Sequence, residues 1–267
     1  MELKKIIKEH IEYKNQIIKL AKADLVKTYR GAALGWAWAI IKPAVTIFVY
    51  WFAFQIGLRA GKDVNGFPFF LWLIAGVVPW FYMGDMISQG TNAIRKYKHL
   101  VNKMKFPIST IPTFYSISKY VTNLILLGLV IVIFIVNGYY PDIYYLQIPF
   151  YVLLTFVFFT AWSLFSSMLS CISKDFANLV KSFVTAVFWL SGILWNPDTI
   201  KIEWLEKVLK VNPVTYLVKG FRNCFINKVW FWESPKTLLC FLLLTTIMIL
   251  LAVWAYKKLK KEIPDVL

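Results

Sequence analysis

Long apolar runs separated by short polar segments dominate this chain. A run of about 20 apolar residues is the length that crosses a bilayer as a helix. Six runs come close to this length, near residues 32–57, 67–90, 108–137, 148–172, 179–196 and 236–256. They are continuous rather than alternating, which favours helices over the strands of a membrane barrel. The pattern predicts an all-α membrane protein with six transmembrane helices.

The N-terminal segment 1–31 has a different pattern. Apolar residues recur there at helical spacing among lysines and glutamates, at Leu3, Ile7, Ile11, Ile18, Ala21 and Leu25. Such an amphipathic helix is typical of the membrane interface, with its apolar stripe toward lipid and its lysines toward anionic headgroups. A soluble helix packed on another subunit is the alternative. The segment lacks the apolar core of a cleavable signal peptide.

The connection before the last apolar run is too long and too patterned for a simple linker. Residues 202–211 have helical apolar spacing that ends at Asn212–Pro213, and residues 214–221 repeat this spacing. Two short amphipathic helices are therefore predicted within about 197–235. They either re-enter the membrane from the outer face or lie on its surface.

Basic residues are distributed unevenly between the two sides of the predicted membrane domain. Lysine and arginine are frequent in 1–31, 94–106 and 257–261, whereas the short loops on the opposite side hold only Arg59 and Lys62. The positive-inside rule then places both termini in the cytoplasm. The net charge of +16 reflects this orientation and attraction to lipid headgroups, and no nucleic-acid partner is expected.

Composition agrees with a membrane protein and offers little for catalysis. The 267 residues are 59% hydrophobic and 16% charged, whereas a soluble domain carries about 25% charged residues. The two histidines, His10 and His99, lie in basic segments, and the three cysteines lack metal-ligand spacing. We therefore expect no catalytic site, no metal site and no cofactor in this chain.

Asp85 is an acidic residue inside the second apolar run. A carboxylate within a membrane is costly, so it is either functional or paired with a nearby cation. Lys42 and Lys119 are the candidate partners. Asp85 is therefore predicted to have either a gating or substrate role or a structural one.

Aromatic residues make up 18% of the chain. Many fit the belts that lie at membrane–water interfaces. The others could line a path for sugars, because aromatic faces provide apolar area without charge. The residues predicted for this path are Trp36, Trp51, Trp80, Tyr82 and Trp189.

Several motifs carry a resemblance to a known family. The segment YRGAALGWAWAIIKP at 29–43 is similar to the start of the first span in polysaccharide-export permeases of the type-2 ABC transporter class. Further matches follow in order over nearly the whole chain, including YWFAFQIGLRAG, LVNKMKFPISTIP, SKDFANLV and an Asn-Pro pair. The forms YWFAFQIGLR and KMKFP look closer to teichoic-acid exporters than to O-antigen exporters. Ser173-Lys174-Asp175 departs from the Arg-Asp pair that relatives often have.

The resemblance implies a complete transport machine. Residues 32–257 would form the permease domain and 258–267 a cytoplasmic tail. The permease would pair with a second copy of itself and with two copies of an ABC ATP-binding subunit, which holds ATP and magnesium. The expected cargo is an undecaprenyl-pyrophosphate-linked wall polysaccharide, teichoic acid in the first instance, exported across the bacterial cytoplasmic membrane. The alternatives are an O-antigen or capsule exporter, a drug or lipid exporter of the same class, or a membrane glycan enzyme.

The resemblance also assigns roles to residues. The segment 94–106 would be a coupling helix that docks on the ATPase, rather than a merely solvated basic loop. Arg30 and Lys42 would receive the pyrophosphate headgroup, and the helices of 197–235 would form the outer exit. The residues expected to contact the ATPase are Lys98, Leu100, Val101, Met104 and Phe106, with Lys174 and Asp175 as a smaller second contact.

Overall fold

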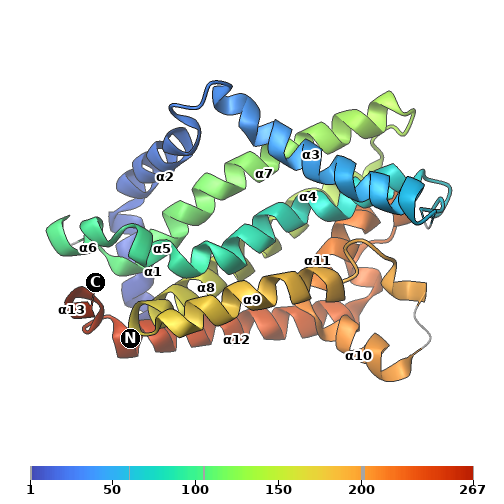
Figure 1. Ribbon diagram of the computed structural model, residues 1–267. Coiled ribbons are helices and arrows are strands. Elements are labelled where there is room, and N and C mark those ends of the chain that lie inside the picture. The colour runs from blue at the N-terminus through green and yellow to red at the C-terminus, as the bar shows by residue number, and fades with distance from the viewer. Residues whose placement is uncertain (1, 60, 105, 200–201, 267) are drawn as a thin grey trace.

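The computed structural model describes residues 2–59, 61–104, 106–199 and 202–266 and is built from helices (Figure 1). The described residues contain no strand, only an isolated bridge between Val64 and Phe67. The all-α prediction is therefore confirmed. Lys105 of the predicted coupling helix, residues 200–201 of the predicted outer helices and both terminal residues lie outside the described ranges.

Five helical segments in the described chain are long and apolar enough to cross a membrane. They are Gly35–Gly57 around α3 (Trp38–Trp51), Phe69–Asn102 starting with α4 (Phe69–Ser88), Ile108–Val136 with α7 (Ile111–Val136), Ile143–Ile172 with α8 (Ile148–Ile172), and Pro235–Leu259, which is α12. The sixth predicted span corresponds to α9 (Lys174–Leu190), which has 17 residues. It rises only about 26 Å, somewhat less than a bilayer core of about 30 Å.

Helix α4 forms the centre of the molecule. It lies against α3, α7, α8, α9 and the short helix α11 (Pro213–Arg222). Its side chains from Leu71 to Val78 are almost completely buried. A helix that is apolar on all sides is surrounded either by other helices or by lipid, and other helices surround α4 here.

The N-terminal segment folds as two helices, α1 (Glu2–Glu12) and α2 (Lys14–Tyr29), where one continuous helix was expected. One face of the pair, with Ile6, Ile17 and Ala21, is buried against the rest of the chain. Another face leaves apolar side chains exposed, those of Leu3, Ile7, Ile11 and Ile18. The pair therefore carries two apolar stripes, one for its own chain and one for a lipid or protein surface.

The two ends of the helical bundle differ in content. Both termini lie at one end, together with α1, α5 (Ala93–Lys96), α6 (Lys98–Met104) and α13 (Ile263–Val266) (Figure 1). At the opposite end lies α10 (Glu203–Val211). The basic segments of the sequence thus gather at the end that holds the termini.

The two predicted outer helices are present as α10 and α11. Helix α11 is mostly buried and packs on α4 and α8, whereas α10 exposes Trp204, Val208 and Val211. Arg222 at the end of α11 is 3% exposed and donates to the carbonyl oxygens of Gly192 (2.8 Å) and Ile193 (2.6 Å). Its guanidinium carbon lies 3.4 Å from the ring centroid of Trp72. This arginine ties α11 to α4 and to the loop after α9.

Candidate functional site

The long second segment is broken near the end of the bundle that holds the termini. Helix α4 stops at Ser88, and the short turn Gly90–Asn92 leads into α5. Serines on α8 hold this turn: Ser163 donates to Gly90 O (2.9 Å) and Ser170 to Thr91 O (2.6 Å). Carbonyl groups at such a break lose helical partners, and these hydroxyls replace them. The α8 serines therefore fix where α5 and α6 project.

The predicted coupling helix is divided between buried and exposed residues. Leu100, Val101 and Phe106 are 4%, 6% and 7% exposed and belong to the chain's own core. Their burial means that they anchor the segment internally. Lys98 is exposed, and Met104 is 67% exposed. Of the five residues predicted to meet the ATPase, only these two are accessible in this structure.

The second predicted contact is joined to the first. Lys174 and Asp175 are exposed at the start of α9, where the Ser173 hydroxyl caps the helix by accepting from the Phe176 backbone N–H (3.3 Å). On α5, Arg95 donates to the carbonyl oxygen of Cys171, just before this turn, at 3.3 Å. The predicted coupling segment and the start of α9 therefore form one connected surface.

A buried carboxylate on α2 binds this region to the N-terminal helices. The Asp24 side chain is 2% exposed. Lys96 Nζ lies 3.1 Å from its Oδ1, Ser118 Oγ donates to its Oδ2 at 2.7 Å, and the Tyr97 hydroxyl also donates to Oδ1. Burial raises the pKa of this carboxyl group, but the hydrogen bonds from Tyr97 and Ser118 and the charge of Lys96 lower it by more. The pKa therefore lies below its ordinary value.

A second carboxylate holds α1 in the same manner. Glu9 accepts from the Tyr256 hydroxyl at 2.8 and 3.0 Å, and also from Ser109. Beside it, His10 Nε2 lies 2.8 Å from Thr113 Oγ1. The sequence analysis did not single out Glu9 or Asp24. The available signal was their helical spacing from the buried residues of their own helices: Asp24 lies three residues after Ala21, and Glu9 three residues after Ile6.

Contacts continue from Lys96 toward the middle of the bundle. The Lys96 ammonium lies 4.8 Å from the ring centroid of Tyr115, whose hydroxyl donates to Asp85 Oδ2 at 3.2 Å. Lys119 Nζ lies 4.0 Å from the same carboxylate oxygen. Of the two candidate partners for Asp85, the structure brings Lys119 within ion-pair distance.

Asp85 and Lys119 open onto a pocket of about 380 Å³. Lys42 of α3 and Tyr82 of α4 also line it, and the end of α2 forms one side. Two lysines and one carboxylate give this pocket a net positive charge. The arrangement is suited to holding an anionic group between the N-terminal helices and the bundle.

Arg30 lies apart from this pocket. It lines a shallow basic groove along α2 together with Lys19, Lys22 and Lys27. The two residues predicted to receive a headgroup, Arg30 and Lys42, are thus placed in neighbouring concave surfaces rather than in one site.

The predicted path aromatics have different environments. Trp80 and Tyr82 are 8% and 2% exposed, with Trp80 packed against Phe188 at 5.4 Å between ring centroids. Trp51 is half-buried beside a cavity of about 280 Å³ between α3, α4 and α7. Only Trp36 (47%) and Trp189 (49%) are well exposed. The buried rings pack the bundle, and Trp36 and Trp189 remain available to a ligand.

Helix α9 carries a polar stripe that the sequence analysis did not recognise. Asn178, Lys181, Ser182 and Thr185 are all exposed and recur at helical spacing. The apolar residues Ala177, Val180 and Phe188 are buried against the bundle. Where such a stripe lies within a membrane, its polar groups face water or another protein, because lipid cannot satisfy them.

The described residues contain no group of three or more metal-ligating side chains. The polar clusters consist of paired charges, hydroxyl groups and aromatic rings. They can bind an anion, hold helices together and line a path.

Comparison with known proteins gives a consistent result. Residues 15–226 match the sequence profile of the family described as ABC-2 type transporter. The chain is 25% identical to the O-antigen export system permease protein RfbA of Myxococcus xanthus, over 83% of this chain and 84% of that protein. It is 24% identical to the protein of the same name from Klebsiella pneumoniae, covering 81% and 82%, and 24% identical to the inner membrane transport permease YadH of Escherichia coli K12, covering 72% and 77%. These names support the O-antigen alternative over the teichoic-acid prediction.

Proposed function

The chain belongs to the ABC-2 type transporter family, and from this we propose that it is the membrane subunit of an ATP-driven exporter for a lipid-linked polysaccharide of the O-antigen kind. The names of the Myxococcus and Klebsiella relatives support this cargo. The broader alternative is a transport permease with another substrate, which the similarity to YadH favours.

The polar stripe of α9 is the observation that carries the proposal. A sugar polymer needs a hydrated path, and one copy of this chain leaves Asn178, Lys181, Ser182 and Thr185 open. A second copy facing this stripe would enclose the path between two α9 helices. We therefore propose a homodimer in which α9 is the sixth span, and in which the exposed Trp189 faces the sugar.

The headgroup of the lipid carrier is proposed to enter between the N-terminal helices and the bundle. The basic groove with Arg30 lies along α2, and the pocket with Lys42 and Lys119 lies behind the end of the same helix. The two phosphates of a pyrophosphate would pair first with the cations of the groove and then with those of the pocket. The exposed stripe of Leu3, Ile7 and Ile11 would hold α1 in the cytoplasmic lipid interface.

ATP hydrolysis is assigned to two copies of a separate subunit, which would bind ATP and magnesium. That subunit would dock where Lys98, Met104, Lys174 and Asp175 are exposed at the end that holds both termini. This end is therefore proposed to be cytoplasmic. The outer helices α10 and α11 would lie at the exit, with α11 inserted among the spans.

Depletion of the protein in its native cells tests the proposed function. We expect loss of surface polysaccharide and accumulation of lipid-linked polymer inside the cell, both restored by the intact chain. Normal surface polysaccharide in depleted cells would contradict the O-antigen-type cargo and favour the broader permease alternative. Mild-detergent purification of the tagged chain, with mass spectrometry of its partners, tests whether an ATP-binding subunit accompanies it.

A further inference from the structure

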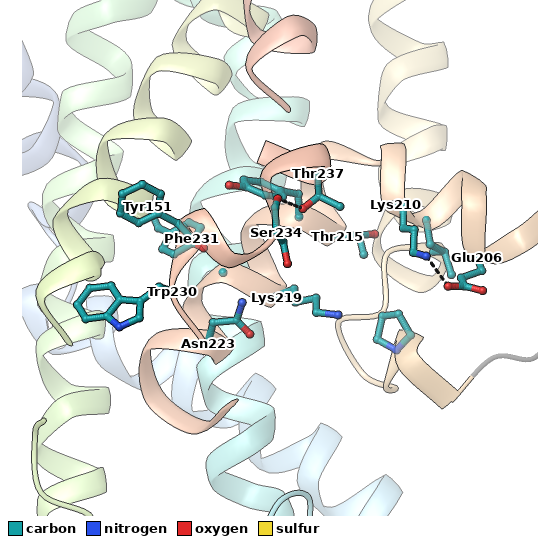
Figure 2. A pocket seen from close by; sticks show the side chains of 14 residues that line it. Tyr151, Glu206, Lys210, Thr215, Lys219, Asn223, Trp230, Phe231, Ser234 and Thr237 are labelled. Carbon is teal, nitrogen blue, oxygen red and sulfur yellow. Dashed lines mark hydrogen bonds and ion pairs between the residues drawn. The ribbon is translucent and has the colours of Figure 1, made fainter. Parts of the chain in front are cut away.

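A partly open pocket of about 180 Å³ lies at the end of the bundle opposite the termini. Its walls come from α8, α10, α11 and the start of α12 (Figure 2). It lies on the α8 and α12 side of α11, and the polar stripe of α9 contributes no residue to its lining. The pathway proposed above therefore does not account for this pocket.

Aromatic side chains form one end of the pocket. Tyr151, Trp230 and Phe231 lie together on one side in Figure 2. The Phe231 ring stacks on Phe150 at 4.1 Å, and Trp230 stacks on Trp232 at 4.4 Å with an interplanar angle of 10°. These outer partners fix the orientation of both lining rings, so the aromatic surface is preformed.

A glycine brings this aromatic end close to α11. A Cβ atom on Gly220 would lie 2.1 Å from Tyr151 Cε1, so only glycine allows the tyrosine ring to contact the helix backbone there. Tyr151 is 1% exposed. The close approach sets the depth of the pocket beside the aromatic surface.

Polar groups of both kinds form the other walls. An ion pair between Glu206 and Lys210, 2.5 Å apart, lies at the far end (Figure 2). Between the two ends lie Thr215, Asn223 and Thr237. The threonine hydroxyls already donate to backbone carbonyls of Ser191 and Ser234, at 3.2 and 2.9 Å, so their oxygens remain acceptors. The pocket thus offers donors and acceptors on one side of an aromatic surface.

We infer that this outer pocket binds a single sugar ring. A sugar has an apolar face of C–H groups for the aromatic end and hydroxyl groups that both donate and accept for the polar walls. Lys210 and Lys219 also line the pocket, but a phosphate offers acceptors only, so it would leave the Glu206 carboxylate and the threonine oxygens without a donor. The volume is below the roughly 300 Å³ of pockets that enclose drug-sized ligands, so it suits one ring rather than an oligosaccharide. That this sugar ring belongs to the exported polymer rests on the proposed function.

Saturation-transfer NMR on the full-length chain in phospholipid nanodiscs tests the inference. The probes are glucose, galactose, mannose and N-acetylglucosamine, each at millimolar concentration. We expect transfer to the ring protons of at least one of them. Replacing Glu206→Gln should weaken that binding about tenfold, because a charge-assisted hydrogen bond is lost. Ser234→Phe, at an exposed position on the rim, should fill the pocket and abolish the signal.

Helix α10 supplies a matched control. Glu203 and Lys207 form a second ion pair at 2.7 Å. These residues are four positions apart, as Glu206 and Lys210 are, but they lie outside the pocket. Glu203→Gln should leave sugar binding unchanged. An absent signal with all four sugars, or equal signals in Glu206→Gln, Ser234→Phe and Glu203→Gln, would overturn the inference. Surface polysaccharide measured in parallel separates the two claims: export without sugar binding refutes only the pocket, and binding without polysaccharide export refutes only the cargo.

Discussion

Lys96 Nζ lies 3.1 Å from Asp24 Oδ1, although 72 positions separate these residues in the chain. The contact joins the predicted coupling region to the N-terminal helix pair. The same lysine lies over the Tyr115 ring, and the Tyr115 hydroxyl donates to Asp85. Asp24 therefore connects the surface proposed for ATPase docking with the pocket proposed for the lipid headgroup.

Replacing Asp24→Asn should destabilise the protein. The amide cannot form the charge-assisted contact with Lys96, and the Lys96 side chain is 43% exposed, which limits the loss. We expect a cost of about 1–3 kcal/mol and a fall of several degrees in the apparent melting temperature in detergent. Glu203→Gln is the control, because its pair with Lys207 is largely exposed to solvent and should contribute little. Equal melting temperatures for Asp24→Asn and the unmodified chain would contradict the structural role of Asp24.

The stability that Asp24 contributes should depend on pH in a defined direction. Its pKa in the folded chain lies below the ordinary value of 3.8. The carboxylate therefore stabilises the fold at all pH values above about 4, and this contribution is lost as the pH falls through the folded pKa. The difference in melting temperature between the unmodified chain and Asp24→Asn should be constant from pH 7 to 5 and shrink below about pH 4. A difference that vanished near pH 6 would indicate a raised pKa instead.

The sequence was sufficient to predict the helical class and most of the spans, because a continuous apolar run that crosses a membrane folds as a helix. It was insufficient for α9. The Ser173 cap starts this helix at Lys174, before the predicted apolar run near 179–196, and Gly192, with φ +66°, follows its end at Leu190, so the helix is displaced toward the N-terminus relative to that run. Its polar stripe was also missed, since its residues are mixed with Leu179, Phe183 and Trp189 in the sequence.

Side-chain environments in charged segments could not be predicted from spacing alone. Leu100, Val101 and Phe106 have the pattern of a docking surface, but such a pattern does not distinguish a partner from the chain's own core. Asp24 lies in a helix rich in lysine, where a carboxylate is usually solvated. Its burial follows from α7 and α5, whose position depends on the whole fold.

Met104→Asp should weaken the association with the ATP-binding subunit without unfolding the chain. Met104 is 67% exposed at the proposed docking surface, and a carboxylate would be desolvated there. The measurement is the amount of ATP-binding subunit that copurifies with the tagged chain. Val208→Asp, at a similarly exposed position on α10, is the matched control and should retain the partner. Leu100→Ala should instead lower the thermal stability of the chain, by about 2–4 kcal/mol, because it removes buried volume.

Loss of the cations proposed to bind the headgroup should reduce export while the complex stays assembled. Arg30→Ala, Lys42→Gln and Lys119→Gln each remove one positive charge from the basic groove or the pocket. We expect about a tenfold loss of export for each, since each removes one charge-assisted contact to phosphate. Copurification of the ATP-binding subunit should not change, and Lys207→Gln at the opposite end should export normally. Unchanged export in all three variants would contradict the headgroup role.

The polar stripe of α9 should be accessible to water during transport. Thiols at Ser182→Cys and Thr185→Cys should react with a membrane-impermeant maleimide during ATP turnover, because a hydrated path allows the thiolate to form. Leu250→Cys on α12 is the control: this residue is 61% exposed among apolar neighbours and should face lipid. Cys171 and Cys224 are buried, and Cys240→Ala removes the partly exposed native thiol. We expect labelling on α9 to exceed labelling at 250 by at least about tenfold, since a thiol in hydrocarbon stays protonated. If the α9 thiols were as unreactive as the one at 250, α9 would face lipid, and the path would have to be formed by other helices.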